Sequence, residues 1–300
     1  MIGKFFVPSR PLYPKTLQTV AKYRPSRRSP FTRQGSAVLA IIVVVALVGC
    51  MLRSMASQQQ ARHTYAPLDS TVDMLYVRVP AVLANSDVDY TGFRVGFNAG
   101  KHVPNYVAWE LTAERTEGAY SRKGVPFQAD ADVDGCAVTA DYRRSGFDRG
   151  HMAPAADMKW DSVAMIQCHY LTNIAPQAQQ LNTGAWNRLE NLCRKWARRY
   201  GRIFIVAGPV LTDSLTRHIG RTGVVVPDRY FKVVVAPDAQ PPMGIGFMMP
   251  NGYVEGGVQQ TAMSIDNVEA ITGLDFFSAL PDSVEADVEA QTSFHQWNVR

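Results

Sequence analysis

Cysteine is scarce in this chain of 300 residues, and its placement argues against a zinc site. Four cysteines occur, and the three beyond position 50 (Cys136, Cys168 and Cys193) form no CxxC pair and show no Cys/His metal spacing. The sequence therefore predicts no zinc module. An oxidising compartment would permit one disulfide among these three residues, and buried free thiols fit the sequence equally well.

Acidic residues are absent from the first 68 positions, and this absence decides how the net charge is interpreted. The formal charge is +5, but nine of the 31 Lys and Arg residues lie in positions 1–53. The remainder of the chain holds 22 basic and 26 acidic residues. The basic excess therefore belongs to the N-terminal segment, and bulk charge gives no argument that the rest of the chain binds nucleic acid.

Charged residues are also missing from positions 37–52, which follow the basic segment 1–36. A run of sixteen residues is at the lower limit for spanning a bilayer, and the basic flank would keep the N-terminus in the cytoplasm. The run ends in Leu47-Val48-Gly49-Cys50, which resembles the lipobox of bacterial lipoproteins, whose cysteine is acylated. We expect a basic cytoplasmic leader at 1–36, followed by a transmembrane anchor or signal segment at 37–52, or a lipid on Cys50.

Both interpretations place the rest of the chain on the far side of a membrane, in the periplasm or at the cell surface. An Arg-rich organelle presequence followed by an inner-membrane anchor also fits the acid-free leader, but five prolines would break its amphipathic helix. The expected location of the domain is therefore membrane-anchored and extracytoplasmic.

The remaining chain predicts a linker and one folded domain. Positions 53–70 are polar and lack apolar periodicity, as a linker does. Apolar residues recur at three- and four-residue spacing over 183–200, which is typical of an amphipathic helix, and a second helix is expected at 264–272 between a Ser264 cap and Gly273. Strand-like runs lie before and after the first helix, at 75–79, 92–98, 106–112, 203–207, 230–235 and 244–249. This order predicts a single α+β domain at 71–300.

The segment 145–160 reads SGFDRGHMAPAADMKW, and its core is an acid, a strong cation, a flexible glycine and an imidazole: Asp148, Arg149, Gly150 and His151. Phosphodiester hydrolysis needs a base that takes a proton from water near neutral pH, and histidine has such a pKa. A guanidinium can meet the charge that develops on the phosphate oxygens. His151 is therefore the candidate base and Arg149 the candidate phosphate contact. A surface turn in which Asp148 caps a helix and pairs with Arg149 is the alternative. The other histidines lack a partner motif and are expected in surface or packing roles: His63, His102, His169, His218 and His295.

Asn182 stands at the start of the helix expected at 183–200, and Glu190 follows eight residues later. A helix separates such positions by about 12 Å along its axis and about 80° around it. That distance is too long for both side chains to bind one small cation directly, but it suits one oxygen ligand and a carboxylate that acts through a water. The cation would polarise a phosphate. Alternatively, Asn182 only caps the helix and Glu190 pairs with a nearby arginine such as Arg194.

Three motifs follow one another along the chain: DRGH at 148–151, NIAPQ at 173–177 and LNxxxWxxLE at 181–190. Together they resemble the sugar-nonspecific DNA/RNA endonucleases of the ββα-metal type, a family that includes mitochondrial endonuclease G and secreted bacterial nucleases. The similarity extends from about residue 105 to about residue 282, with weaker matches at 207–209, 226–232 and 271–277. The combination of the three motifs is specific, whereas the weaker matches alone would mean nothing.

The resemblance implies the ββα-metal nuclease fold, in which a central antiparallel sheet is flanked by helices. It implies that His151 is the general base and that Asn182 is the sole direct protein ligand of Mg²⁺, for which Mn²⁺ would substitute. Glu190 would then hold a metal-bound water.

The resemblance also assigns the residues around these three. Arg149 and Asn173 shape the site, and Asp148 and Asn173 are assigned to substrate binding. By spacing, a further phosphate-binding arginine of the family falls on Arg122, for which Arg115, Lys123 and Arg143 are alternatives.

The expected activity is endonucleolytic cleavage of DNA and RNA with little sequence preference, giving 5′-phosphate and 3′-hydroxyl ends. No zinc-finger, homeodomain or RRM pattern is present, so contacts should go to the phosphate backbone. A membrane-anchored module that binds or takes up nucleic acid without cleavage is the alternative, and the presence of His151, Asn182 and Glu190 argues against it. The family's frequent dimers also make a homodimer an expectation.

Overall fold

The computed structural model describes residues 73–297 apart from residue 213. The segments predicted as leader (1–36), membrane anchor or signal (37–52) and linker (53–70), Cys50 included, lie outside the described residues. Among the residues that are described, no helix is long and apolar enough to cross a bilayer. The fold described below is that of the domain predicted at 71–300.

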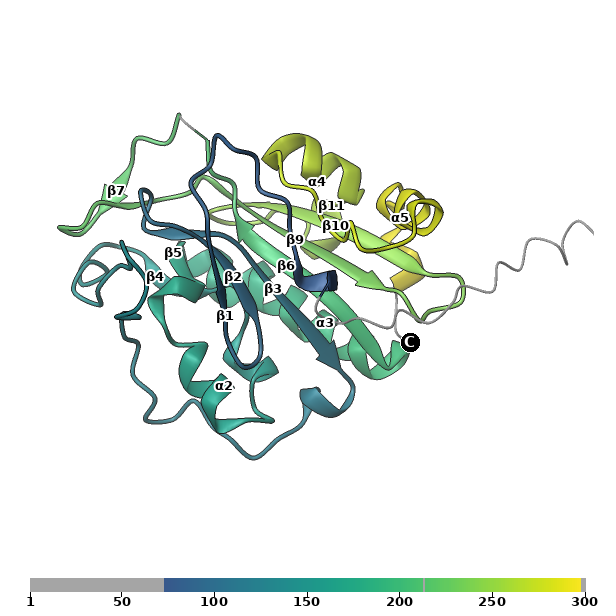
Figure 1. Cartoon of the computed structure of the whole chain (residues 1–300), viewed down its shortest axis with the longest axis horizontal. Helices are drawn as coiled ribbons and strands as arrows, with labels where there is room; N and C mark the ends of the chain where they lie inside the picture. Colours follow the sequence, from purple (N-terminus) through teal and green to yellow (C-terminus); the bar gives the residue numbers. More distant parts are fainter. Residues whose placement is uncertain (1–72, 213, 298–300) are drawn as a thin grey trace, which may run out of the picture. The chain divides into compact units, whose positions relative to one another are not determined.

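A seven-stranded sheet forms the centre of the domain, and every pair of neighbouring strands in it is antiparallel (Figure 1). Most neighbours in the sheet also follow each other along the chain, but β3 and β6 are separated by residues 113–201. This long excursion from the sheet contains all three motifs. The strands in spatial order are β1 (Ser86–Asp89), β2 (Arg94–Asn98), β3 (Val103–Thr112), β6 (Arg202–Pro209), β9 (Arg229–Ala236), β10 (Met243–Pro250) and β11 (Ala262–Met263).

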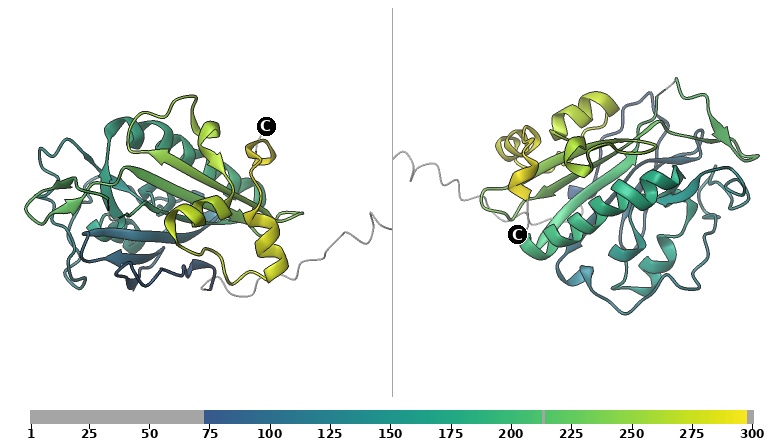
Figure 2. Two further views of the ribbon diagram at one scale, coloured as in Figure 1. Left: turned by 90° about the horizontal axis from the view of Figure 1, so that it is seen from above. Right: turned by 180° about the vertical axis from the view of Figure 1, so that it is seen from behind.

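Helices cover both faces of this sheet. Figure 2 shows α2 and α3 on one face and α4 and α5 on the opposite face. The helices are α2 (Ser162–Gln167), α3 (Asn187–Tyr200), α4 (Ile265–Thr272) and α5 (Asp282–Glu289). The short helical turns are η1 (Asp73–Leu75), η2 (Glu114–Thr116), η3 (Ala155–Asp157), η4 (Leu171–Asn173), η5 (Leu181–Trp186), η6 (Val258–Thr261) and η7 (Phe294–Trp297).

The central strands are continuously apolar because both of their faces are buried. On β6, Ile203 and Ile205 join the core that also contains Leu189 and Trp196 of α3. The intervening Phe204 is equally buried but points to the other face, since successive side chains of a strand alternate. The domain therefore has three layers, with α3 and the motif-bearing excursion on one side of the sheet.

The DRGH and NIAPQ motifs are the two strands of a separate antiparallel ladder, β4 (Asp148–His151) and β5 (Ile174–Gln177). Gly150 lies opposite Ala175 in regular extended backbone, so the flexibility expected of this glycine is not what the fold uses. A Cβ at this position would come within 2.2 Å of the Gln177 Oε1 atom. Gly150 is therefore needed for close packing beside His151. A further short ladder joins β7 (His218–Ile219) and β8 (Val224–Val225).

The predicted elements agree with the structure except at two places. Strands expected at 92–98, 106–112, 203–207, 230–235 and 244–249 are confirmed as β2, β3, β6, β9 and β10. The helix expected at 264–272 is confirmed, with the Ser264 side chain accepting a hydrogen bond from the Asn267 amide and Gly273 in the left-handed conformation. The strand expected at 75–79 is wrong, because only a single bridge, Arg78 to Asp275, forms there.

The second difference concerns the helix expected at 183–200, which begins with the π-helical turn η5 before α3 starts at Asn187. Gly184 has φ −99° and ψ −111°, so the two helical pieces meet at a kink. For the cysteines, the sequence left a disulfide and free thiols as alternatives. Cys136, Cys168 and Cys193 are all free, which confirms thiols rather than a disulfide, although Cys136 is only partly buried.

Candidate active site

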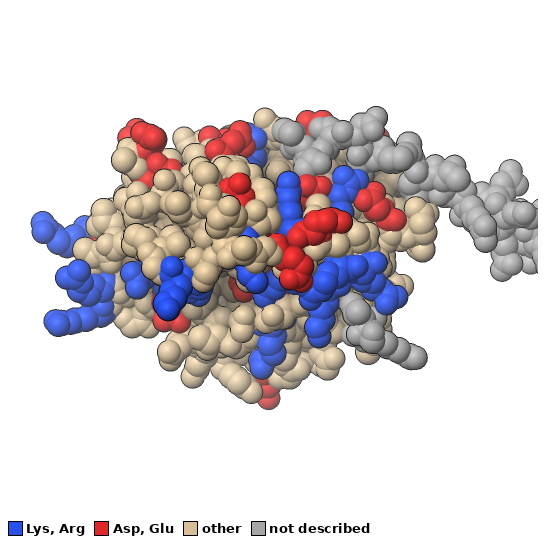
Figure 3. Space-filling model, turned by 90° about the horizontal axis from the view of Figure 1, so that it is seen from below, with Lys and Arg blue, Asp and Glu red and all other residues tan. Residues whose placement is uncertain are grey.

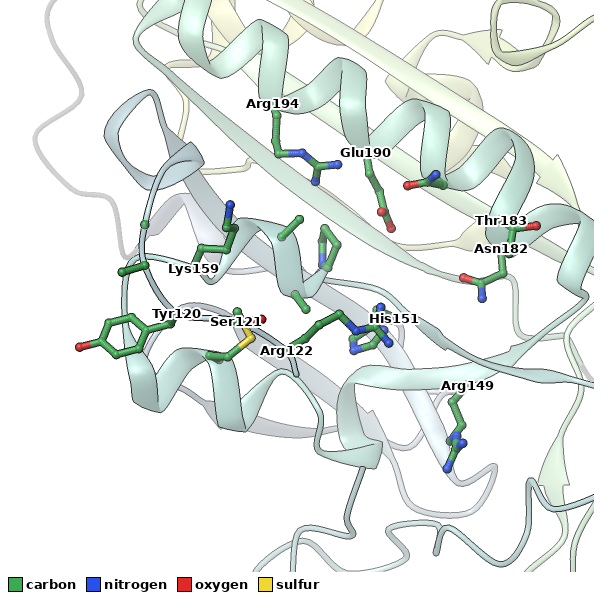
Figure 4. A pocket seen from close by; sticks show the side chains of 17 residues that line it. Tyr120, Ser121, Arg122, Arg149, His151, Lys159, Asn182, Thr183, Glu190 and Arg194 are labelled. Atoms are coloured by element: carbon green, nitrogen blue, oxygen red, sulfur yellow. The ribbon is translucent and has the colours of Figure 1, made fainter. Parts of the chain in front are cut away.

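A cavity of about 760 Å³ lies between the start of α3, the end of β4 and the loop 118–122 (Figure 4). Its wall includes His151, Asn182 and Glu190. The Lys and Arg side chains on the wall outnumber the single acid, Glu190, and they are Arg122, Arg149, Lys159 and Arg194. The cavity is therefore locally cationic although acids outnumber bases after position 53, and it suits an anionic ligand.

His151 presents a neutral imidazole to this cavity. Its Nε2 atom is buried and has no hydrogen-bond partner. Burial, followed by the neighbouring His169, Arg122 and Arg149, lowers the pKa of His151 to about 3. The imidazole is consequently unprotonated at pH 7, which is the form that accepts a proton.

The position of the His151 ring is fixed by its neighbours. The His169 ring meets it edge-on, with 5.0 Å between the centroids and 88° between the planes, and the Phe127 ring lies 5.2 Å away. The indole Nε1 of Trp186 donates a hydrogen bond of 3.1 Å to the His151 carbonyl oxygen. This bond joins the DRGH strand to the turn that carries Asn182.

Asn173 is fully buried and does not line the cavity. Its Nδ2 donates to the carbonyl oxygens of Ala153 (2.9 Å) and Cys168 (2.8 Å), and its Oδ1 accepts from the Ala153 amide (2.9 Å). The Asn173 carbonyl also accepts from the Met152 amide at 3.0 Å. Three of these four bonds hold the backbone at Met152 and Ala153, directly after His151, so the structure gives Asn173 a positioning contact.

Asn182 is oriented by Asp148. The Asn182 Nδ2 donates to Asp148 Oδ2 at 2.9 Å, across from η5 to β4. An ionised carboxylate only accepts hydrogen bonds, so the amide nitrogen must face Asp148 and the amide oxygen is left for another partner. Figure 4 shows the Asn182 side chain directed from η5 toward the cavity. Asp148 itself is absent from the cavity wall.

Glu190 directs its carboxylate from the first turn of α3 into the cavity (Figure 4). Arg194, the alternative partner considered for Glu190, instead donates to Asp157 at 2.7 Å and to Asn191 at 3.0 Å. No salt bridge of Glu190 occurs within residues 73–297. Burial raises the pKa of Glu190 to about 7 and Asp157 adds to this, while Lys232, Arg194 and Arg122 oppose it.

Lys232 of β9 supplies a buried positive charge close to Glu190. Its Nζ has no hydrogen-bond partner and lies 4.4 Å from the ring centroid of Trp186 and 4.8 Å from that of Trp109. Burial lowers the pKa of Lys232. Aromatic faces stabilise an ammonium that has lost its water, so the two rings act in place of hydrogen bonds. The charge of Lys232 in turn favours ionised Glu190.

The two predicted arginines both reach the cavity. Arg122 lines it, whereas the alternatives Arg115, Lys123 and Arg143 do not. Arg149 also lines it, but its guanidinium carbon lies 4.5 Å from the centroid of the Phe127 ring. Figure 4 shows Arg149 directed away from Glu190 and Asn182. Of the two arginines, Arg122 lowers the pKa of His151 more than Arg149 does.

Three residues of the site were not found from the sequence. His169 was expected in a surface or packing role, yet its ring contacts the ring of His151. Asp157 is fully buried and holds Arg194, and Lys232 comes from a strand eighty residues beyond the DRGH motif. Lys232 did carry a signal, since a single lysine interrupts the apolar run at 230–235.

Comparison with known proteins agrees with this geometry. A model of the family described as DNA/RNA non-specific endonuclease matches residues 71–283. The chain belongs to this family. The match covers the whole of the excursion that carries the three motifs, so the resemblance expected from the sequence is confirmed.

Several members of the DNA/RNA non-specific endonuclease family are similar to the chain. Nuclease EXOG, mitochondrial, of Mus musculus is 34% identical over 212 residues, which cover 65% of this chain and 57% of the relative. Endonuclease G, mitochondrial, of Homo sapiens is 35% identical over 185 residues, covering 57% and 62%. Nuclease C1 of Cunninghamella echinulata var. echinulata is 29% identical over 226 residues, covering 70% and 90%. The chain therefore spans less than two thirds of the length of the first two relatives.

A solved member of the family has the same fold. The structure described as "Crystal structure of the EndoG/EndoGI complex: Mechanism of EndoG inhibition" aligns with a TM-score of 0.62 and 28% sequence identity, covering 66% of this chain and 88% of that one. This similarity confirms the predicted α+β class with a central antiparallel sheet flanked by helices.

The relatives also correct one prediction. The names of the mouse and human relatives, and of Nuclease 1 of Schizosaccharomyces pombe, place those proteins in mitochondria. They contradict the membrane-anchored periplasmic or cell-surface location expected here. The physical reason is that a basic, acid-free leader before an apolar run is common to export signals and organelle presequences, so composition does not separate them.

Proposed function

We propose that this protein is a divalent-metal-dependent endonuclease that hydrolyses phosphodiester bonds in DNA and RNA with little sequence preference. The observation that carries the proposal is the convergence of three groups on one cationic cavity. They are the imidazole of His151, the amide oxygen that Asp148 leaves available on Asn182, and the carboxylate of Glu190, which has no ion pair among the described residues.

The donor set fits a hard cation such as Mg²⁺, with Mn²⁺ as the expected substitute. Asn182 and Glu190 offer only oxygen atoms, which Mg²⁺ prefers, and a site with one neutral ligand leaves the ion most of its water. Asn182 would hold the ion directly, and Glu190 would hold it through that water. When bound, the ion polarises the phosphate and stabilises the charge of the leaving oxygen.

The protein's own residues supply the rest of the chemistry. His151 takes a proton from the attacking water on a nitrogen of its neutral imidazole, and the water oxygen forms a bond to phosphorus as the bond to the 3′-oxygen breaks. The products are a 5′-phosphate and, once the departing oxygen gains a proton, a 3′-hydroxyl. Arg122 and Arg149 meet the charge on the non-bridging phosphate oxygens. Asn173 and Asp148 act through His151 and Asn182, which they position.

The charge distribution supports binding through the phosphate backbone. On the face seen in Figure 3, Lys and Arg side chains lie in several groups across the surface, with acidic side chains between some of them. The basic residues of the cavity add to these groups. These local groups of basic side chains can therefore bind a polyanion although the domain as a whole has no net positive charge. Contacts to phosphate carry no sequence preference.

The test is cleavage of a supercoiled plasmid and of a structured RNA by the full chain, with Mg²⁺ or with EDTA. We expect both to be cut with Mg²⁺ and neither with EDTA. The new DNA ends should be extended by a polymerase, which requires a 3′-hydroxyl. Binding of both nucleic acids without any cut in Mg²⁺ would contradict the proposal and favour a binding or uptake module.

Glu190 gives the metal requirement a predictable pH dependence. Only the ionised carboxylate can act on a cation, and its pKa is raised to about 7. Between pH 6 and pH 8 the ionised fraction rises roughly tenfold, so the Mg²⁺ concentration for half-maximal plasmid cleavage should fall by about that factor. His151, with its pKa at about 3, does not titrate in this interval. Glu190→Gln is the control, and the same pH dependence in that variant would contradict the assignment.

A further inference from the structure

Helices α4 and α5 lie on the sheet face opposite to α3 (Figure 2), and three of their carboxylates meet there. They belong to Asp266 and Glu269 of α4 and Glu289 of α5. One oxygen atom of each lies within 4.8 Å of the others. Asp266 is exposed, Glu269 is half-buried and Glu289 is buried, so the group extends from solvent into the interior.

Glu289 is the carboxylate of this group that lacks a partner. The residue is only 7% exposed, and its Oε1 atom is buried without a hydrogen-bond partner. No other carboxylate oxygen among the described residues is buried in this way without a partner. The charges that act on it most strongly are Glu269, Glu285, Asp266 and Asp275, all of them acids. Burying a carboxylate without a counter-charge is costly, so this arrangement calls for a cation.

The backbone that carries Glu289 is packed tightly against the sheet. The helix that carries it is pressed against β10, because a Cβ on Gly244 would come within 2.2 Å of the Val288 carbonyl oxygen. Gln291, just beyond the helix, accepts from the Gly244 amide at 3.1 Å and donates to the Pro242 carbonyl at 3.2 Å. The packing and these two bonds set the position of the helix end that carries Glu289.

Glu269 is held in the same manner. Its Oε1 accepts a hydrogen bond of 2.7 Å from the Phe276 amide, in the turn after α4. That bond fixes one oxygen and leaves the other for a ligand.

We propose that Asp266, Glu269 and Glu289 bind one divalent cation of the calcium type. Carboxylate oxygens without nitrogen or sulfur donors suit a hard cation, and Ca²⁺ accepts six to eight oxygens in flexible geometry. The exposed side of the group, at Asp266, admits the waters that complete the shell. The bound ion would join α4 to α5 and so secure the outer layer of the sheet. It would do so independently of catalysis, because α3 and the cavity lie on the other face.

The experiment measures Ca²⁺ binding by the full chain carrying Asn182→Ala, which removes the ligand proposed for the catalytic ion. Equilibrium dialysis at pH 7.5 should find one Ca²⁺ per chain in this parent and none after Glu289→Gln is added. A Ca²⁺ concentration a hundredfold above Kd should raise the thermal midpoint of the parent by roughly 5 to 10 °C and leave that of the Glu289→Gln variant unchanged.

Two controls keep the result interpretable. Glutamine has the size of glutamate without its buried charge, so in EDTA the Glu289→Gln variant should unfold at the same temperature as its parent or higher. Asp282→Asn, an acid of α5 outside the group of three, should retain the Ca²⁺ response. Absence of bound Ca²⁺ in the parent, or an equal Ca²⁺ response with Glu289→Gln, would overturn the proposal whether or not the protein cleaves nucleic acid.

Discussion

Replacing His151 with alanine should lower the rate of plasmid and RNA cleavage by about 10²- to 10⁴-fold, the range that a positioned general base contributes. The effect should be similar on both substrates, because the proton comes from water and not from the sugar. Binding of DNA in EDTA should change little, since Arg122, Arg149 and Lys159 remain on the cavity wall. The measurement is the single-turnover rate with Mg²⁺ in excess.

The alanine variant allows a more specific test than the loss itself. The ring it removes lies against Phe127 and His169, so free imidazole added to the buffer has a place to bind and should restore part of the rate. His102→Asn is a matched control, because His102 has φ 60°, which asparagine tolerates, and it lies outside the cavity wall. A rate within a few-fold of wild type would show that another group, His169 first, takes the proton.

Asn182→Ala should also reduce cleavage strongly, by roughly 10²- to 10⁴-fold, since the polarising ion supplies several kcal/mol and each 1.36 kcal/mol is a factor of ten. Adding Mg²⁺ should not restore the rate, because alanine offers the ion no side-chain oxygen at this position. The readout is the dependence of the cleavage rate on Mg²⁺ concentration.

Asp148→Asn is the informative partner of that variant. It keeps the shape of Asp148 but no longer forces the Asn182 amide to present its oxygen, which should weaken metal affinity by about 10- to 100-fold. High Mg²⁺ should therefore rescue Asp148→Asn and leave Asn182→Ala inactive. Equal rescue of both variants would contradict the assignment of Asn182 as the direct ligand.

The sequence predicted best the relative positions of residues that lie close together in the chain. Asn182 and Glu190 were expected on one broad helical side, and both line the same cavity even though a π-helical turn replaces the first turn of the expected helix. The five long strands of the sheet could be located because their apolar runs are buried on both faces.

Contacts between segments that are distant in the sequence could not be predicted from local patterns. Lys232 lies opposite Ala207 of β6 and Phe247 of β10, and only this register brings its charge beneath α3. An alternating strand shows that Lys232 shares a face with Tyr230 and Val234, but not which helix covers that face. His169 reaches His151 through the fold of the segment between β4 and β5, for which no spacing rule exists.

Local patterns are misleading at two positions. Glycine in the DRGH motif suggests flexibility, whereas the missing side chain of Gly150 makes room for Gln177. The segment 75–79 alternates like a strand, but it has only a single bridge partner within the described chain. In both cases the deciding contact comes from elsewhere in the sequence.

The hydrogen bond between Asp148 and Asn182 links two motifs that lie thirty-four positions apart. In the proposed mechanism these two side chains depend on each other, because the Asp148 carboxylate determines that the amide oxygen of Asn182 faces the cavity. Substitutions at the two positions should therefore be correlated among family members. Family members that lack the acid of the DRGH motif should also lack the asparagine of the LNxxxWxxLE motif, and inactive members should carry both changes together.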